Sequence, residues 1–197
     1  MRPNVSSLRS SLLRLHEDII SLQEISAFIS NDPQLTLVEK AVIVLEDRRF
    51  FTHCGFDWKS IFREFIKAIS FRRHGGASTI DIQLFRTISK RYERTLRRKI
   101  REAVGAWAIQ SKFSKMEILR CYLNVAYFGT NLHGVEAASR EIFGKNSTNL
   151  DLNEATFIAA LLVYPKPRIA TINWQTKIGR RAQYGRLLLR TLKESFQ

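Results

Sequence analysis

The sequence is poor in residue types that define several classes of protein. Its 197 residues include only two cysteines, four prolines and nine glycines. Two cysteines are too few for a disulfide framework, so Cys54 and Cys121 are predicted to be free thiols. The prolines and glycines form no long linker or low-complexity tract, and no internal repeat is visible. The length therefore suits one ordinary domain with a sizeable core.

Long apolar runs are also missing, and no secretory leader is visible in the sequence. The apolar runs are far shorter than a bilayer-spanning helix requires. The first seven residues lack the apolar region of a signal peptide. We therefore expect either a protein that stays inside the cell, or one that reaches a surface by a route that the sequence does not record.

Acidic residues are scarce relative to basic ones. The chain has 18 aspartates and glutamates against 32 lysines and arginines, which gives a formal net charge of +14. Such an excess indicates an anionic partner. Nucleic acid, an acidic membrane surface and a phosphate-bearing substrate are the three candidates.

Apolar residues recur at helical spacing along most of the chain, and no alternating run supports a sheet. The predicted fold class is all-α, or nearly so. Residues 1–34 are predicted to hold an N-terminal helix, at 7–29, which packs on the core or lies on a membrane surface. Residues 35–197 are predicted to form the main domain, with helices that include segments near 36–48, 58–71, 152–162 and 179–196.

Glu46 stands where an apolar run, residues 41–45, gives way to a polar and aromatic turn. A partly buried carboxylate at such a boundary suits acid–base chemistry, because burial tunes its pKa. The alternative is a structural role, in which Glu46 and Asp47 pair with Arg48 and Arg49 at the end of a helix.

A basic, glycine-rich loop at 72–79 leads into another helical pattern at Ile80. Glycines let backbone amides approach an anion, and hydroxyls such as those of Ser78 and Thr79 can donate to it or cap the helix. The loop lacks the spacing of a Walker sequence, so by itself it is a weak indication of a phosphate site.

Basic residues then follow one another at four-residue steps: Arg86, Lys90, Arg94, Arg98 and finally Glu102. On one continuous helix these side chains would form a single stripe that suits an anion. The alternative is a solvated charged face with an Arg98–Glu102 pair.

Five blocks resemble, in the family's order, the motifs of the peptidoglycan glycosyltransferase (transglycosylase) family. This domain occurs in monofunctional transglycosylases and in class A penicillin-binding proteins. The resemblance extends over residues 35–192. Its blocks are 46–57, 76–80 with 83–84, 98–103, 114–119 with 122–124 and 127–129, and 154–165.

The resemblance implies a lysozyme-like helical enzyme that polymerises a lipid-linked disaccharide, lipid II, into glycan strands with inversion. Glu46 matches the catalytic base of the family and Glu102 its second acidic residue. The resemblance also implies a magnesium or manganese ion, with Glu102 as a possible ligand, and no organic cofactor is expected. The positions that match or flank the pyrophosphate-binding ones are Ser78, Thr79, Gln83, Arg86, Arg94, Arg98, Lys99 and Arg101.

The partners implied are a lipid-linked sugar pyrophosphate and a membrane surface, without nucleic acid. The implied location is peripheral, on the outer face of the bacterial plasma membrane, and a cytoplasmic location is the alternative. The second block departs from the family, because Asp81 and Ile82 stand where threonine and glutamine are usual. This predicts a carboxylate in the pyrophosphate region.

Two alternatives follow from this departure: a divergent enzyme for another polyprenyl-pyrophosphate-linked sugar, or an inactive copy. A helical nucleic-acid-binding domain and a glycan-cleaving enzyme are more distant alternatives.

Overall fold

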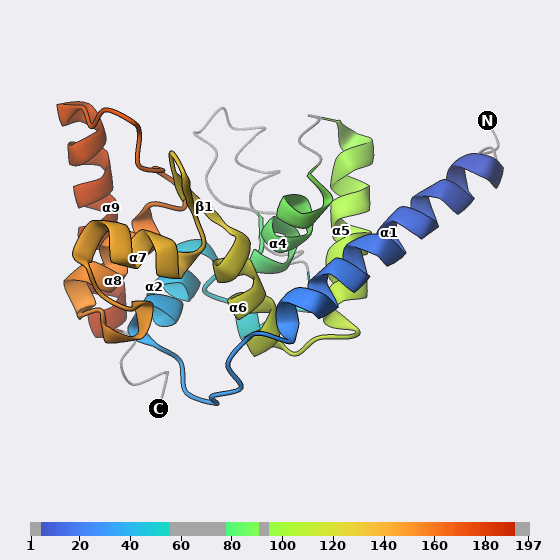
Figure 1. The fold of residues 1–197 in the computed structure, drawn as a ribbon, viewed down its shortest axis with the longest axis horizontal. Helices are drawn as coiled ribbons and strands as arrows, with labels where there is room; N and C mark the ends of the chain where they lie inside the picture. The colour runs from blue at the N-terminus through green and yellow to red at the C-terminus, as the bar shows by residue number, and fades with distance from the viewer. Residues whose placement is uncertain (1–4, 56–77, 91–94, 192–197) are drawn as a thin grey trace.

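The computed structural model describes residues 5–55, 78–90 and 95–191 (Figure 1). The predicted helix at 58–71 and Arg94 lie outside this part of the chain. Within it the fold is almost entirely helical, which confirms the predicted fold class. The α-helices are α1 (Val5–Ser26), α2 (Leu37–Glu46), α4 (Ile80–Ser89), α5 (Leu96–Gln110), α6 (Lys115–Val125), α7 (Val135–Phe143), α8 (Leu152–Ala160) and α9 (Ile172–Thr191).

The helices form two packed groups that meet at α6. Helices α2, α8 and α9 pack on one another, and α4 packs against α5 and α6. Helix α6 contacts α4 and α1 in one group and α7 next to the other (Figure 1). Two short 3₁₀ helices, η1 (Phe50–Thr52) and η2 (Ser147–Asn149), complete the helical elements of the described residues.

Helix α2 lies in the core, as its apolar run predicts. Thr36 and Glu39 cap its start reciprocally, since the Thr36 hydroxyl accepts from the Glu39 N–H and the Glu39 carboxylate accepts from the Thr36 N–H. Residues 41–44 are buried. The helix ends at Glu46, two residues before the predicted end, and this places the Glu46 carboxylate at the edge of the core.

The prediction of one continuous basic stripe from Arg86 to Glu102 is wrong. Helix α4 ends at Ser89, and Lys90 takes a left-handed conformation with φ 49° that stops the helix. Helix α5 begins only at Leu96, with Thr95 as its N-cap. The two helices pack side by side, so residues at opposite ends of the proposed stripe meet across a helix–helix contact.

A small hairpin, β1 (Tyr127–Gly129) and β2 (Leu132–His133), was not predicted. Strands of three and two residues are too short to show an alternating pattern. Helix α9 begins at Ile172, earlier than predicted, where the Thr171 hydroxyl accepts from the Trp174 N–H.

Helix α1 contacts α4 and α6. Ile19 and Leu22 are buried, whereas Leu12 and Leu13 near its start are exposed. Figure 1 shows this first half extending away from the other helices. The division into 1–34 and 35–197 stays a prediction. In the described residues, no helix combines the length and apolarity needed to cross a membrane.

Candidate active site

Glu46 lies at the C-terminal end of α2, and its side chain is largely buried. Its Oε1 accepts a hydrogen bond from Arg181 Nη2 at 2.6 Å. The same nitrogen donates to the Leu45 carbonyl at 3.0 Å, which fixes the guanidinium beside the helix end. The structural alternative predicted Arg48 as an ion-pair partner at this helix end. Arg48 donates a hydrogen bond to the Tyr184 hydroxyl instead. Glu46 is therefore held by a residue of α9 that lies 135 positions later.

The Gln83 amide connects Glu46 to α4 and α6. Gln83 Nε2 donates to Glu46 Oε2 and to the Ser78 carbonyl, both at 3.4 Å. Gln83 Oε1 accepts from the Tyr122 hydroxyl at 2.6 Å. Burial raises the pKa of Tyr122, so its hydroxyl remains a donor at neutral pH. This bond directs the amide nitrogen of Gln83 toward Glu46.

Glu102 lies on α5 and is almost completely buried. Arg86 from α4 binds it at two points, with Nε 2.8 Å from Oε1 and Nη2 3.1 Å from Oε2. Arg98, one turn earlier on α5, places Nε 3.3 Å from Oε1. Arg86 Nη2 also lies 3.4 Å from the Ser78 hydroxyl oxygen.

Glu46 and Glu102 thus belong to one polar network, which passes through both the backbone carbonyl and the hydroxyl of Ser78. The connection runs from Glu46 through Gln83, Ser78 and Arg86 to Glu102. Two carboxylates that are far apart in sequence lie at the two ends of a polar path that contains Arg86, and Arg98 contacts Glu102 at one end. Such a path can bind an anion near Arg86 and Arg98 while Glu46 accepts a proton.

The other predicted site residues within the described part of the chain lie outside this network. Thr79 is buried as the N-cap of α4, where its hydroxyl accepts from the Ile82 N–H and donates to the Gly55 carbonyl at 2.7 Å. Lys99 is exposed and Arg101 half-buried on α5. Arg94 lies outside the described residues. Their part in substrate binding stays a prediction.

The sequence predicts a carboxylate in the pyrophosphate region, and the structure places Asp81 between α4 and α6, outside the polar network of Glu46 and Glu102. Its side chain has no exposed surface, and both of its oxygens lie 3.0 Å from Lys115 Nζ of α6. Burial raises the pKa of the Asp81 carboxyl, and the neighbouring Lys115 ammonium opposes that effect. Asp81 packs between helices α4 and α6, because its position in the first turn of α4 faces the protein interior.

Asp81 belongs to a buried group in which ligand atoms of Asp47, His53 and Asp81 lie within 4.8 Å of one another, the spacing of a metal site. His53 Nε2 lies 2.8 Å from Asp47 Oδ2, and His53 Nδ1 lies 3.5 Å from Lys115 Nζ. The Lys115 ammonium therefore supplies the positive charge within this group.

Sequence reasoning missed Arg181, Tyr122 and Lys115. Arg181 is one of many basic residues in the C-terminal helix, and its spacing carries no signal. Ser114 and Glu117 form a capping box, but it fixes only the start of α6. Which α6 side chains turn toward α4 depends on how the two helices pack.

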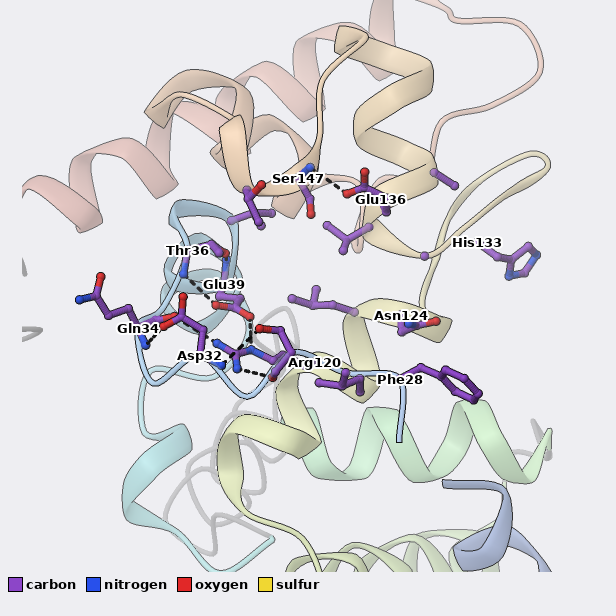
Figure 2. Close-up of a pocket in the computed structure, with 18 residues that line it drawn as sticks. Phe28, Asp32, Gln34, Thr36, Glu39, Arg120, Asn124, His133, Glu136 and Ser147 are labelled. Carbon is purple, nitrogen blue, oxygen red and sulfur yellow. Dashed lines mark hydrogen bonds and ion pairs between the residues drawn. The ribbon is translucent and has the colours of Figure 1, made fainter. Parts of the chain in front are cut away.

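A hollow of about 600 Å³ lies apart from these residues, between 28–39, α6, α7 and η2 (Figure 2). None of the predicted site residues lines it. Arg120 is bound by Glu39 Oε1 at 2.8 Å and by the carbonyls of Ser30 and Gln34. The charge of Arg120 is thus already satisfied within the protein.

Comparisons with known proteins indicate one family. A family model described as Transglycosylase matches residues 14–187. A biosynthetic peptidoglycan transglycosylase of Acinetobacter baylyi is 41% identical over 129 residues, which are 65% of this chain and 58% of that protein. One of Bdellovibrio bacteriovorus is 37% identical over 154 residues, 78% of this chain and 57% of that protein.

Penicillin-binding protein 1A of Clostridium tetani is 40% identical over 129 residues, 63% of this chain but 16% of that protein. The chain spans little more than half the length of the two transglycosylases and a small part of the penicillin-binding protein. Because the family model extends from α1 to α9 and includes every residue of the polar network, the chain belongs to the transglycosylase family.

Proposed function

We propose that this chain is a peptidoglycan glycosyltransferase that polymerises lipid II into glycan strands with inversion at the anomeric carbon. The observation that carries the proposal is the network joining Glu46 to Glu102 through Gln83, Ser78 and Arg86. It puts a candidate base and a group of arginines on one continuous polar path, as transfer from a pyrophosphate donor requires.

Glu46 acts as the general base in this proposal. It removes the proton from the acceptor sugar hydroxyl while the hydroxyl oxygen attacks the anomeric carbon of the donor. The bond from that carbon to the pyrophosphate oxygen breaks, and the pyrophosphate leaves with the electron pair. A single displacement of this kind inverts the anomeric centre. Arg181 and Gln83 hold the Glu46 carboxylate in the position from which it accepts the proton.

Arg86 and Arg98 stabilise the charge that grows on the leaving pyrophosphate. Arg98 Nε lies 3.3 Å from Glu102 Oε1, so the same carboxylate holds both guanidinium groups. Glu102 orients both guanidinium groups before the substrate binds, and preorganised donors of this kind contribute strongly to catalysis.

A magnesium or manganese ion is part of the proposal only together with the substrate. Both Glu102 oxygens already accept from Arg86, so Glu102 by itself fits a bare cation poorly. With pyrophosphate bound, phosphate oxygens would complete the ligand set and Glu102 would contribute one ligand. The ion would add positive charge beside the leaving group. Removal of divalent ions with EDTA, followed by titration with magnesium or manganese, tests this part.

The membrane surface is the second proposed partner. Ile100, Val104 and Trp107 lie on one face of α5 and are 60%, 52% and 59% exposed. Lys99 and Arg101 flank this apolar face, a pattern typical of helices that lie on an acidic bilayer. The same helix carries Glu102, so this contact would place the site close to a lipid-linked donor. The proposed location is the outer face of the bacterial plasma membrane.

The decisive experiment incubates the full chain with purified lipid II and magnesium and resolves the glycan products by electrophoresis. The wild type is expected to form polymer, and Glu46→Gln none. The control is Glu136→Gln, which changes a half-exposed carboxylate away from the network. No polymer from the wild type, or equal polymer from Glu46→Gln, would refute the proposal.

A parallel reaction with another polyprenyl-pyrophosphate-linked sugar separates a divergent enzyme from an inactive copy.

A further inference from the structure

The four side chains of Asp47, His53, Asp81 and Lys115 form a buried charged cluster beside the candidate site. Asp47 follows α2 directly, and His53 follows η1. Asp81 belongs to α4, and Lys115 is the first residue of α6. Lys115 Nζ also lies 4.5 Å above the centre of the Phe50 ring. The cluster thus joins four separate segments of the chain.

The contact with Lys115 indicates which ring nitrogen of His53 carries the proton. A lysine ammonium can only donate, so His53 Nδ1, which faces it at 3.5 Å, accepts. This leaves the imidazole proton on Nε2, which lies 2.8 Å from Asp47 Oδ2. The same Asp47 oxygen accepts from the Ile80 backbone N–H at 3.1 Å. Asp47 is thereby fixed to the first turn of α4.

The two ends of this chain of contacts adjoin the reacting groups. Asp47 is the neighbour of Glu46 and the C-cap of α2, and its own backbone N–H donates to the Ile43 carbonyl. Ile80 and Asp81 stand at the start of α4, one turn before Gln83, whose amide reaches Glu46. A shift of Asp47 relative to α4 would change the contact between Glu46 and Gln83 directly.

We propose that Asp81 and Lys115 are positioning residues: their ion pair holds His53 against Asp47 and so fixes Glu46 relative to the Gln83 amide. The catalytic part of this inference rests on the proposed function, and the structural part does not. In this proposal Asp81 supports the candidate site from the protein interior, and it does not oppose the binding of an anion.

The test compares this ion pair with a second one of similar burial that also reaches α6. Arg120 binds Glu39, and both side chains are largely buried. Lys115→Met and Arg120→Met each remove one α6 cation and leave a buried carboxylate, so both variants should lose stability. Asp81→Asn/Lys115→Met removes both charges and keeps similar volumes, so this double variant avoids an unpaired buried charge.

Hydrogen exchange measured by mass spectrometry provides a readout that needs no substrate. In Lys115→Met and in the double variant, exchange in 46–55 and 78–83 should rise about tenfold or more, because a buried charge-assisted bond is lost. Exchange in α8 should stay at the wild-type level. Arg120→Met should leave 46–55 and 78–83 unchanged. Equal patterns for Lys115→Met and Arg120→Met, or a wild-type pattern in the double variant, would overturn the inference.

Kinetics on lipid II supply the second readout. The double variant should lose about 10- to 100-fold in kcat with little change in KM, because a misplaced base affects the chemical step. Arg120→Met should keep the wild-type kcat when each variant is assayed well below its own unfolding temperature. An unchanged kcat in the double variant would overturn the positioning role. A wild type without activity would refute the proposed function, whereas the exchange experiment would still decide whether the cluster positions Asp47.

Discussion

Arg86 and Glu102 form a two-point ion pair between α4 and α5, with contacts of 2.8 and 3.1 Å across sixteen positions of sequence. The pair neutralises a buried carboxylate and directs a guanidinium toward Ser78. It is also the link through which Glu102 joins the network of Glu46. Much of the proposed chemistry therefore depends on how two helices pack.

Replacement of Arg86 by lysine tests whether activity depends on the charge of Arg86 or on its two-point contact with Glu102. Arg86→Lys keeps the positive charge but cannot bind Glu102 at two points. We expect polymerisation of lipid II to fall about 100-fold, as for a lost preorganised donor. The matched change is Arg140→Lys in the exposed Arg140–Glu136 pair, where no loss is expected. Full activity of Arg86→Lys would show that charge alone suffices.

Arg181 and its neighbour Arg180 provide a second matched pair. Arg181→Met removes the 2.6 Å partner of Glu46, whereas Arg180→Met changes an exposed side chain of the same helix. We expect Arg181→Met to lower kcat by about 10-fold or more, because the base is no longer held in position. Arg180→Met should behave as the wild type. The comparison uses steady-state rates on lipid II, and similar rates for both variants would contradict the assigned role of Arg181.

Replacement of Gly105 by alanine should destabilise the protein, although alanine usually stabilises a helix. A Cβ at this position of α5 would overlap the buried ring of Phe85 on α4. Gly105→Ala should therefore lower the free energy of unfolding by about 1 to 3 kcal/mol, and it should also lower activity by pushing α5 away from α4. Urea denaturation measures the first effect.

The control for Gly105 is Gly179 on α9, where an added Cβ meets open space. Gly179→Ala should raise the free energy of unfolding by up to about 1 kcal/mol, since alanine favours the helix. A stabilised Gly105→Ala would contradict the close approach of Phe85 to Gly105 between α4 and α5.

The two cysteines should differ sharply in reactivity. Burial, with a smaller effect of Glu117, raises the pKa of Cys121 to about 12, whereas Cys54 is exposed. Because the thiolate is the reactive form, Cys121 should stay unmodified in the native protein at about pH 8 and react only near its raised pKa or after unfolding. Labelling with a thiol reagent should count one accessible thiol in the native state. Cys54→Ser should abolish that labelling, and a second rapidly reacting thiol would contradict the burial of Cys121.

The apolar face of α5 should determine binding to acidic vesicles. Val104→Asp places a charge in the middle of the face formed by Ile100, Val104 and Trp107, so co-sedimentation with anionic vesicles should weaken about tenfold or more. Gln175→Asp adds the same charge at an exposed position of α9 and serves as the control. Equal weakening by both variants would indicate attraction by net charge and no specific contact of α5.

Local sequence patterns were sufficient to predict most helices. The spacing of apolar residues predicts the type of element, the capping box at Ser114 and Glu117 predicts the start of α6, and Gly144 predicts the end of α7. Each of these signals acts within a turn or two of helix, which is why it can be read without the fold. The hairpin at 127–133 was missed because its strands are too short for such a signal.

The sequence was sufficient to predict the helical class, the family and two candidate site carboxylates, Glu46 and Glu102. The partners of these carboxylates depend on the tertiary structure. Arg181 reaches Glu46 from α9, Arg86 reaches Glu102 because Lys90 ends α4, and Asp81 turns inward to Lys115. Helical periodicity assigns a side chain to a face of its own helix, whereas the contact that it makes depends on the angle and distance at which another helix packs against that face.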